Sequence, residues 1–277
     1  MKTQWHDVFE SIAASEASHR YCIGFTARSG STWLGSLIQK SDILGIPLEW
    51  FNPDAAGKTV RGSACRDLAQ YYQYLKIART SGDVFGMELT WPQARMVFNS
   101  GYPNLFDDIQ HWFYLRRRDY VAQGVSLYKA ASSGHFHSVQ ANNKKQKVNY
   151  DGKAIAASTL RIMATEFGFD SFYSDRGFRT EELWYEDIIS TTPEAILMRF
   201  IDVLQLPISA YRHVDFGALS SRFEKVGDSQ NELMMSQFRR EHPEFVAYWD
   251  QYRGKRSVDN FVKEYPQYKR QAAVNIP

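Results

Sequence analysis

The stretch Tyr21-Cys22-Ile23-Gly24-Phe25-Thr26-Ala27-Arg28-Ser29-Gly30-Ser31-Thr32-Trp33-Leu34 decides the fold. Its first six residues form a short, mostly apolar run that is typical of a buried strand. Residues 27–32 are small or favour turns, and apolar residues then recur at the spacing of one helix face, at Leu34, Leu37 and Ile38. A strand, a loop of small residues and a helix form the opening of a βα unit.

Later segments repeat this order. Strands are predicted at residues 84–89, 111–115 and 183–185, and helices follow the second and third of them. Thr191-Thr192-Pro193-Glu194 supplies cap and first-turn residues for the last helix, whose apolar face is Ile196, Leu197, Phe200, Ile201 and Leu204. Alternating strands and helices predict an α/β protein with a P-loop-like three-layer α/β/α fold around a central, mainly parallel sheet.

The chain is expected to form a single domain over residues 1–277, because no Pro/Gly-rich linker divides it. Residues 1–20 are predicted to be an N-terminal arm, and residues from about 228 to 277 a helical extension. The polar, lysine-bearing segment 132–153 is interpreted as a surface loop. Residues 47–60 are also interpreted as a loop, and the two loops are expected to build the acceptor pocket of an enzyme.

Composition excludes several classes of protein. Apolar residues make up 44% of the 277 residues and charged ones 23%, which is ordinary for a globular protein. Lys and Arg total 33 against 31 Asp and Glu, so a net charge of +2 argues against a nucleic-acid partner. Two cysteines and no long apolar run predict a cytoplasmic protein without a transmembrane segment.

The loop at residues 27–32 has the composition of an anion site. Backbone N–H groups and the helix dipole converge where a parallel strand runs into a helix. Gly30 allows close approach of a ligand, and Arg28 adds a permanent charge. The alternative is a plain strand-to-helix connection in which Ser31 or Thr32 caps the helix.

The sequence also indicates the kind of anion. ATPase loops carry lysine directly before the hydroxyl residue, whereas Gly30 is followed here by Ser31 and Thr32. The strand at 111–115 ends in arginines rather than in a magnesium-binding aspartate. We therefore expect a site for phosphate and sulfate esters with no metal. The alternatives are a P-loop kinase of a small hydroxyl compound and a non-catalytic nucleotide-binding module.

Five motifs in order resemble the bacterial Stf0-type sulfotransferases, which use 3′-phosphoadenylyl sulfate (PAPS) and include trehalose 2-sulfotransferase. The resemblance covers roughly residues 20 to 205. It rests on Arg28-Ser29-Gly30-Ser31-Thr32, on the segment from Gly45 to Phe51 and on Gly86-Met87-Glu88-Leu89-Thr90-Trp91, followed by Arg117-Arg118-Asp119 through Ser126 and by Tyr185-Glu186-Asp187.

The resemblance implies roles for single residues. Arg28 and the N–H groups of Ser29, Gly30, Ser31, Thr32 and Trp33 are expected to hold the bridging phosphosulfate. An arginine after the strand predicted at 111–115, together with Ser126, would bind the 3′-phosphate. The spacing to Asp119 favours Arg117, and the spacing to Ser126 favours Arg118. Tyr185 would approach the adenine, or is a core residue at a strand end.

Glu49 is the expected general base, with Arg28 as the second catalytic residue, and 3′,5′-ADP (PAP) is the expected product. The expected acceptor is a hydroxyl of a carbohydrate or glycolipid, and a homodimer is possible by family analogy. Two departures from the family concern the acceptor: lysine is frequent where Glu88 stands, and Ile46 replaces a glutamate of the trehalose enzyme. These departures argue against trehalose.

Overall fold

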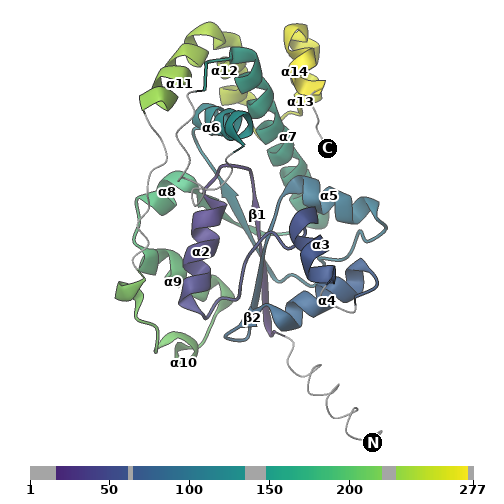
Figure 1. Cartoon of the computed structure of the whole chain (residues 1–277), viewed down its shortest axis with the longest axis vertical. Coiled ribbons are helices and arrows are strands. Elements are labelled where there is room, and N and C mark those ends of the chain that lie inside the picture. The colour runs from purple at the N-terminus through teal and green to yellow at the C-terminus, as the bar shows by residue number, and fades with distance from the viewer. Residues whose placement is uncertain (1–16, 62–64, 135–147, 220–228, 274–277) are drawn as a thin grey trace, which may run out of the picture.

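The computed structural model describes residues 17–61, 65–134, 148–219 and 229–273, so most of the arm expected at 1–20 lies outside it. The strands in these residues form a five-stranded sheet in the order β2-β3-β1-β4-β5 (Figure 1). β1 (His19–Phe25) lies between β3 (Val84–Leu89) and β4 (His111–Arg116), parallel to both. β5 (Thr180–Trp184) is parallel to β4, and only the short β2 (Thr80–Ser81) is antiparallel. The predicted mainly parallel sheet is confirmed.

The helices of the described residues follow in chain order. They are α2 (Ser31–Ser41), α3 (Pro53–Arg61), α4 (Leu68–Ala78), α5 (Trp91–Asn99), α6 (Tyr120–Ser133), α7 (Gly152–Arg176), α8 (Tyr185–Ile189), α9 (Pro193–Leu204), α10 (Ile208–Tyr211), α11 (Ser229–Glu241), α12 (Pro243–Tyr252), α13 (Val258–Glu264) and α14 (Lys269–Ala273).

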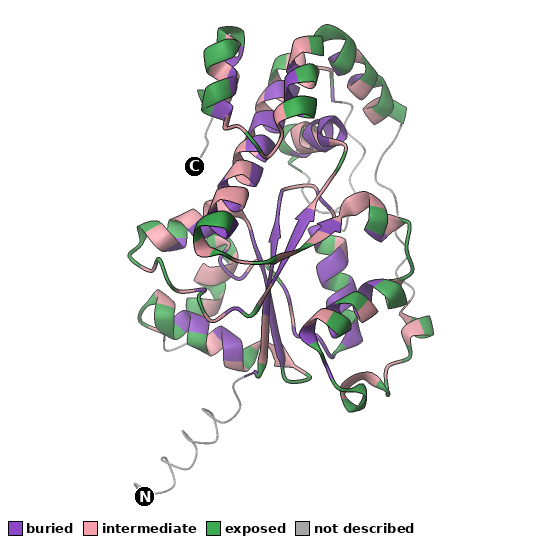
Figure 2. Ribbon diagram, turned by 180° about the vertical axis from the view of Figure 1, so that it is seen from behind, coloured by how far each residue is buried: buried purple, intermediate pink, exposed green. Residues whose placement is uncertain are grey.

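Alternate residues of the strands build two cores on opposite faces of the sheet. Tyr21, Ile23 and Phe25 of β1 pack with α2 and α9 on one face. Cys22, between them, points to the other face, where the core includes residues of α4, α5 and the second half of α7. Because a strand sends successive side chains to opposite faces, a fully buried strand serves both cores. Figure 2 shows the strands buried between helices on either side, so the expected three-layer α/β/α fold is confirmed.

A third core lies beyond the sheet, in the helical region at the top of Figure 1. α6 and the first half of α7 pack there with α11, α12 and α13. Gly124 of α6 allows the close approach of α7, because a Cβ at this position would lie 2.0 Å from the Thr159 hydroxyl oxygen. Through this third core, the C-terminal helices pack on α6, the helix that follows β4.

Three local expectations were wrong. Tyr185 is the first residue of α8 rather than a strand residue, because the last partner that β4 offers, Arg116, pairs with Trp184. Residues 53–61 form α3 rather than a loop. The predicted loop 132–153 loses its ends to α6 and α7, and residues 135–147 lie outside the described part of the chain.

The register brings the functional motifs to one edge. Gly24 of β1 pairs with Leu89 of β3 on one side and with Tyr114 of β4 on the other. The residues that follow these strands therefore meet at the carboxyl edge of the sheet. The chain passes from β1 to β3 on one side and later to β4 on the other, and open α/β sheets bind ligands at such a reversal of strand order.

Candidate functional site

The loop after β1 turns sharply through two left-handed residues. Arg28 has φ 65° and Gly30 has φ 92°. Gly30 is the N-cap of α2 and supplies no side-chain hydrogen bond. The alternative interpretation, in which Ser31 or Thr32 caps the helix, is therefore wrong. The left-handed Gly30 completes the turn one residue earlier than that interpretation assumed, and α2 begins at Ser31.

Ser29 is fully buried in this loop, and its Oγ has no hydrogen-bond partner among the described residues. Ser31 is also buried, Trp33 is half-buried and Thr32 is exposed. A buried hydroxyl without a partner costs free energy. Next to this buried hydroxyl, the start of α2 has no side-chain cap, while the Trp33 N–H donates to the Gly30 carbonyl at 3.1 Å. A helix start without a side-chain cap favours an anion.

α6 holds this loop from the β4 side. The buried Gln123 amide donates to the Thr26 hydroxyl at 2.8 Å and to the Ala27 carbonyl at 2.7 Å. One turn further along, the Ser126 hydroxyl accepts a hydrogen bond of 3.1 Å from Arg28 Nε. Asp119 is the N-cap of α6, as expected, and accepts from the Ala122 N–H. α6 thus fixes both the start of the loop and its arginine.

The three arginines after β4 have different surroundings. Arg116 Nη2 makes an ion pair of 2.5 Å with Glu182. The exposed Arg118 forms a bidentate pair with Asp187, at 2.5 and 2.8 Å, outside the site. Arg117 is half-buried, and its Nε makes no hydrogen bond to any described residue, although Glu186 lies 3.9 Å away. Of the two arginines that the motif left open, Arg118 is held by Asp187, whereas the carboxylate beside Arg117 is Glu186, at 3.9 Å.

Tyr185 joins this group from α8. The Arg117 guanidinium lies over its ring, with 4.6 Å between the guanidinium carbon and the ring centroid. The same ring lies against Gly30, where a Cβ would come within 3.0 Å of Tyr185 Cδ2. Tyr185 is therefore neither a strand residue nor part of the core, and its ring connects the loop after β1 with Arg117.

The electrostatics of this group favour an anion. Burial and then the nearby Arg117 cation lower the pKa of Arg28. Two arginines that disfavour each other's charge gain stability when a negative group binds between them. The cluster of Arg28, Arg117, Ser126 and Tyr185, which we call the anion cluster, has the residue types that hold a phosphate bidentately.

Glu49 lies on the other side of β1, in a segment that packs against β3 and α2 and turns at Glu49 itself, where the Trp50 N–H donates to the Leu48 carbonyl and the Asn52 N–H to the Glu49 carbonyl. The Glu88 N–H donates to the Leu48 carbonyl at 2.9 Å, and Trp50 Nε1 donates to the Ile46 carbonyl at 2.9 Å. Trp50 and Phe51 are buried, so the segment is anchored on both sides of Glu49. Glu49 itself is half-buried and keeps access to solvent.

Gln93 of α5 orients the Glu49 carboxylate. Its side-chain oxygen accepts the Thr90 N–H at 2.9 Å and completes a capping box at the start of α5. Its amide nitrogen therefore points away from the helix and donates to Glu49 Oε2 at 2.8 Å. The capping box fixes the direction of Gln93, and Gln93 fixes the carboxylate.

Glu88 is a second carboxyl group beside Glu49. It is 3% exposed, and its Oε1 has no hydrogen-bond partner in the described part of the chain. That oxygen lies against the second turn of α2, 2.8 Å from where a Cβ of Gly35 would stand. Burial, and then the charge of Glu49, raise the pKa of Glu88 well above its ordinary value. The position at which the resemblance leads one to expect lysine is thus a buried carboxyl group.

The residues of the anion cluster and Glu49 are among those proposed from the sequence, but three residues that hold them or their neighbours in place are not. Gln123, Gln93 and Glu186 were not singled out. Of these, only Gln93 has a local signal, because Thr90-Trp91-Pro92-Gln93 is a capping-box pattern. The other two act on residues 68 to 97 positions away.

Fold and site together define an α/β protein in which two arginines, a serine and a tyrosine gather on one side of β1 and an oriented carboxylate lies on the other. A family model described as Stf0 sulphotransferase matches residues 20–241, and the chain belongs to this family. Membership implies transfer of a sulfuryl group. Among the curated proteins, none matches the chain in sequence.

The described residues lack two further features. They contain no group of three or more His, Cys, Asp or Glu side chains arranged to hold a metal ion. None of the helices in these same ranges combines the length and the apolarity that crossing a membrane requires.

Proposed function

We propose that the protein transfers the sulfuryl group of PAPS to a hydroxyl of a carbohydrate or glycolipid acceptor and releases 3′,5′-ADP. The observation that carries this proposal is the anion cluster, in which Arg28 donates to Ser126 while Arg117 lies over Tyr185. Two arginines, a hydroxyl and an aromatic ring fit the phosphates and the base of a nucleotide.

The residues present fit PAPS at both of its charged ends. The buried Ser29 Oγ and the uncapped start of α2 would receive the 5′-phosphosulfate together with Arg28. Arg117, whose guanidinium lies over Tyr185 rather than in a bidentate pair with a carboxylate, would receive the 3′-phosphate together with Ser126. Tyr185, which contacts both loops, would lie beside the adenine.

Bound PAPS supplies an activated sulfuryl group on its 5′-phosphate. Transfer would form a bond from sulfur to the acceptor oxygen and break the bond from sulfur to the bridging oxygen. Arg28 and the N–H groups at the start of α2 would stabilise the negative charge that develops on the departing phosphate. Glu49, oriented by Gln93, accepts the proton of the acceptor hydroxyl.

A thermal-shift titration tests the nucleotide. We expect 3′,5′-ADP to raise the melting temperature in a saturable way, because a ligand that binds only the native state stabilises it. ATP at the same concentration should have a weaker effect. Stabilisation by magnesium-ATP and none by 3′,5′-ADP would contradict the proposal in favour of a kinase.

The variant Glu49→Gln tests the base. It keeps the shape of the side chain and removes its ability to take a proton, so turnover with labelled PAPS should fall by a factor of about 10² to 10⁴. Its affinity for 3′,5′-ADP should stay unchanged. The acceptor for this assay is to be found by mass spectrometry of cell extracts incubated with enzyme and labelled PAPS. Normal turnover by the variant would remove Glu49 from this role.

A further inference from the structure

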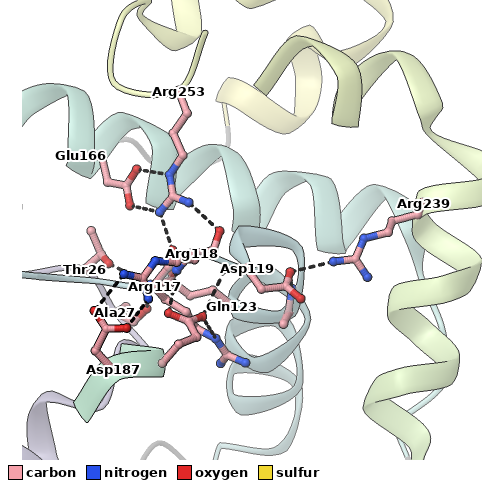
Figure 3. Close-up of polar contacts among 12 residues, drawn as sticks. Thr26, Ala27, Arg117, Arg118, Asp119, Gln123, Glu166, Asp187, Arg239 and Arg253 are labelled. Carbon is pink, nitrogen blue, oxygen red and sulfur yellow. Dashed lines mark hydrogen bonds and ion pairs between the residues drawn. The ribbon is translucent and has the colours of Figure 1, made fainter. Parts of the chain in front are cut away.

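Arg253, at the end of α12, forms hydrogen bonds with the backbone of the turn that carries Arg117. Its Nη1 donates to the Arg118 carbonyl at 2.7 Å, and its Nη2 donates to the Arg117 carbonyl at 2.5 Å (Figure 3). Arg253 lies beyond residue 241, where the match to the family ends. A residue from the C-terminal helices thus holds the backbone of the anion cluster.

The same guanidinium is anchored in the core through Glu166 of α7. Nε donates to one carboxylate oxygen at 2.7 Å, and Nη2 donates to the other at 2.6 Å. Glu166 is fully buried, and a buried carboxylate is stable only when it is paired. The planar fork therefore has a fixed position, with four hydrogen bonds to three residues (Figure 3).

The other polar groups of the turn are held as well. Glu186 accepts the N–H groups of Arg118 and Asp119, at 2.9 and 3.2 Å. Arg239 of α11 donates to the Asp119 carboxylate at 2.8 Å (Figure 3). Carbonyls, N–H groups and the N-cap side chain are each bound by a charged residue from another element. The direction in which Arg117 leaves the backbone is set by these contacts, with Arg253 on the carbonyl side.

We propose that Arg253 is a positioning residue for recognition of the 3′-phosphate, acting through the backbone of Arg117. This proposal rests on the proposed function, because it assigns the 3′-phosphate to Arg117. It makes the C-terminal helices part of the nucleotide site although they contribute no side chain to it.

The test compares two nucleotides that differ only in the 3′-phosphate, namely 3′,5′-ADP and 5′-AMP, by titration calorimetry on the full chain. Arg253→Lys keeps a cation opposite Glu166, but an ammonium group cannot present the planar set of four hydrogen bonds. The ratio of the dissociation constant for 5′-AMP to that for 3′,5′-ADP measures recognition of the 3′-phosphate. We expect this ratio to fall by about tenfold in the variant, which is the size of one charged hydrogen bond. A general loss of structure would weaken both nucleotides equally and leave the ratio unchanged.

A second variant guards against misfolding. Glu166→Leu combined with Arg253→Met removes both charges, so no unpaired charge stays buried. Its ratio should fall in the same way. Arg256→Lys is the matched control, because Arg256 pairs with Glu264 instead and should leave the ratio unaltered. A wild-type ratio in either Arg253 variant overturns the proposal. A wild-type protein that does not distinguish the two nucleotides overturns the nucleotide assignment, and this proposal with it.

Discussion

Arg28 and Ser126, 98 positions apart in the chain, are joined by a hydrogen bond of 3.1 Å from the guanidinium to the hydroxyl. The bond connects the loop after β1 with the second turn of α6. Under the proposed function, this places the group that binds the 5′-phosphosulfate in contact with a group that binds the 3′-phosphate. The two ends of the nucleotide are therefore coupled through the protein.

Replacing Ser126 tests this coupling. Ser126→Ala removes a partner of Arg28 as well as a donor to the ligand, so affinity for 3′,5′-ADP and for 5′-AMP should both fall. We expect about tenfold for the former, the value of a hydrogen bond to a charged group, and less for the latter. Calorimetry measures both. Ser132→Ala, at an exposed position on the same helix, is the control. Unaltered 5′-AMP binding by Ser126→Ala would show that the two ends are independent.

Arg117 and Arg118 should differ strongly in their effect on the nucleotide. Arg117→Gln removes a cation from the anion cluster, and affinity for 3′,5′-ADP should fall by about 10- to 100-fold. Arg118→Gln breaks an exposed pair with Asp187 and a contact with the Trp184 ring, neither of which involves the anion cluster. Exposed pairs contribute little, so we expect a change within about threefold. Equal losses in the two variants, measured by calorimetry, would contradict the assignment.

The capping box of α5 allows the role of Gln93 to be separated from the stability of the helix. Gln93→Glu retains an oxygen that can accept the Thr90 N–H, but it replaces the donor to Glu49 with a second carboxylate. Turnover should fall by about tenfold or more, because the Glu49 carboxylate loses its orientation. The capping box is retained, so any fall in the melting temperature reports repulsion between the two neighbouring carboxyl groups. The affinity for 3′,5′-ADP should stay close to that of the wild type. Full activity in this variant would leave Gln93 a purely structural residue.

Glu88 predicts a dependence of stability on pH. Its pKa is raised in the folded state, so its favourable contribution is complete below the ordinary value of 4.5 and is lost as the pH rises through the folded pKa. Glu88→Gln stays neutral, and its melting temperature should exceed that of the wild type by a margin that grows with pH. Scanning fluorimetry between about pH 5 and pH 9 measures this margin. Glu194→Gln, on the exposed surface of α9, should show none. A constant margin for Glu88→Gln would refute the prediction.

Gly30 tests the conformation of the loop after β1. Ala at this position requires an unfavourable left-handed φ of 92° and places its Cβ 3.0 Å from the Tyr185 ring. The backbone term alone costs about 1–2 kcal/mol. Gly177 also has a left-handed φ, of 65°, but a Cβ there would face open space, so Gly177→Ala measures the cost of the backbone conformation alone. Gly30→Ala should therefore lower the free energy of unfolding by more than Gly177→Ala, and it alone should weaken 3′,5′-ADP binding. Denaturant titration and calorimetry provide the two measurements.

The sequence predicts the sheet and its first loop because their signals are local. The apolar strand at 21–25 and the periodic residues of α2 depend on neighbours in the chain. α7 escapes such reasoning, since its apolar residues lie on several faces. Ile155 and Leu160 pack in the C-terminal core, while Phe169 and Phe172 pack beneath the sheet. No single stripe marks this helix.

The choice among the arginines depends on distant partners. Arg118 is occupied by Asp187, 69 positions away, and Arg116 by Glu182, 66 positions away. No local pattern contains these pairs, so the motif alone left Arg117 and Arg118 as alternatives. Tyr185 was misplaced for a related reason, because the end of β5 is set by where β4 ends. Motifs identify the residue types of a site, and tertiary pairing decides which residue is available.

The central position of β1 has a consequence for divergence within such a family. The residues proposed for the nucleotide lie on the loop after β1 and on the side of β4 and β5, whereas Glu49, Glu88 and Gln93 lie on the side of β3. Substitutions on the β3 side can then alter the choice of acceptor while the donor site is inherited unchanged. Glu88 lies on the β3 side, so a different residue at this position would be a change of this kind.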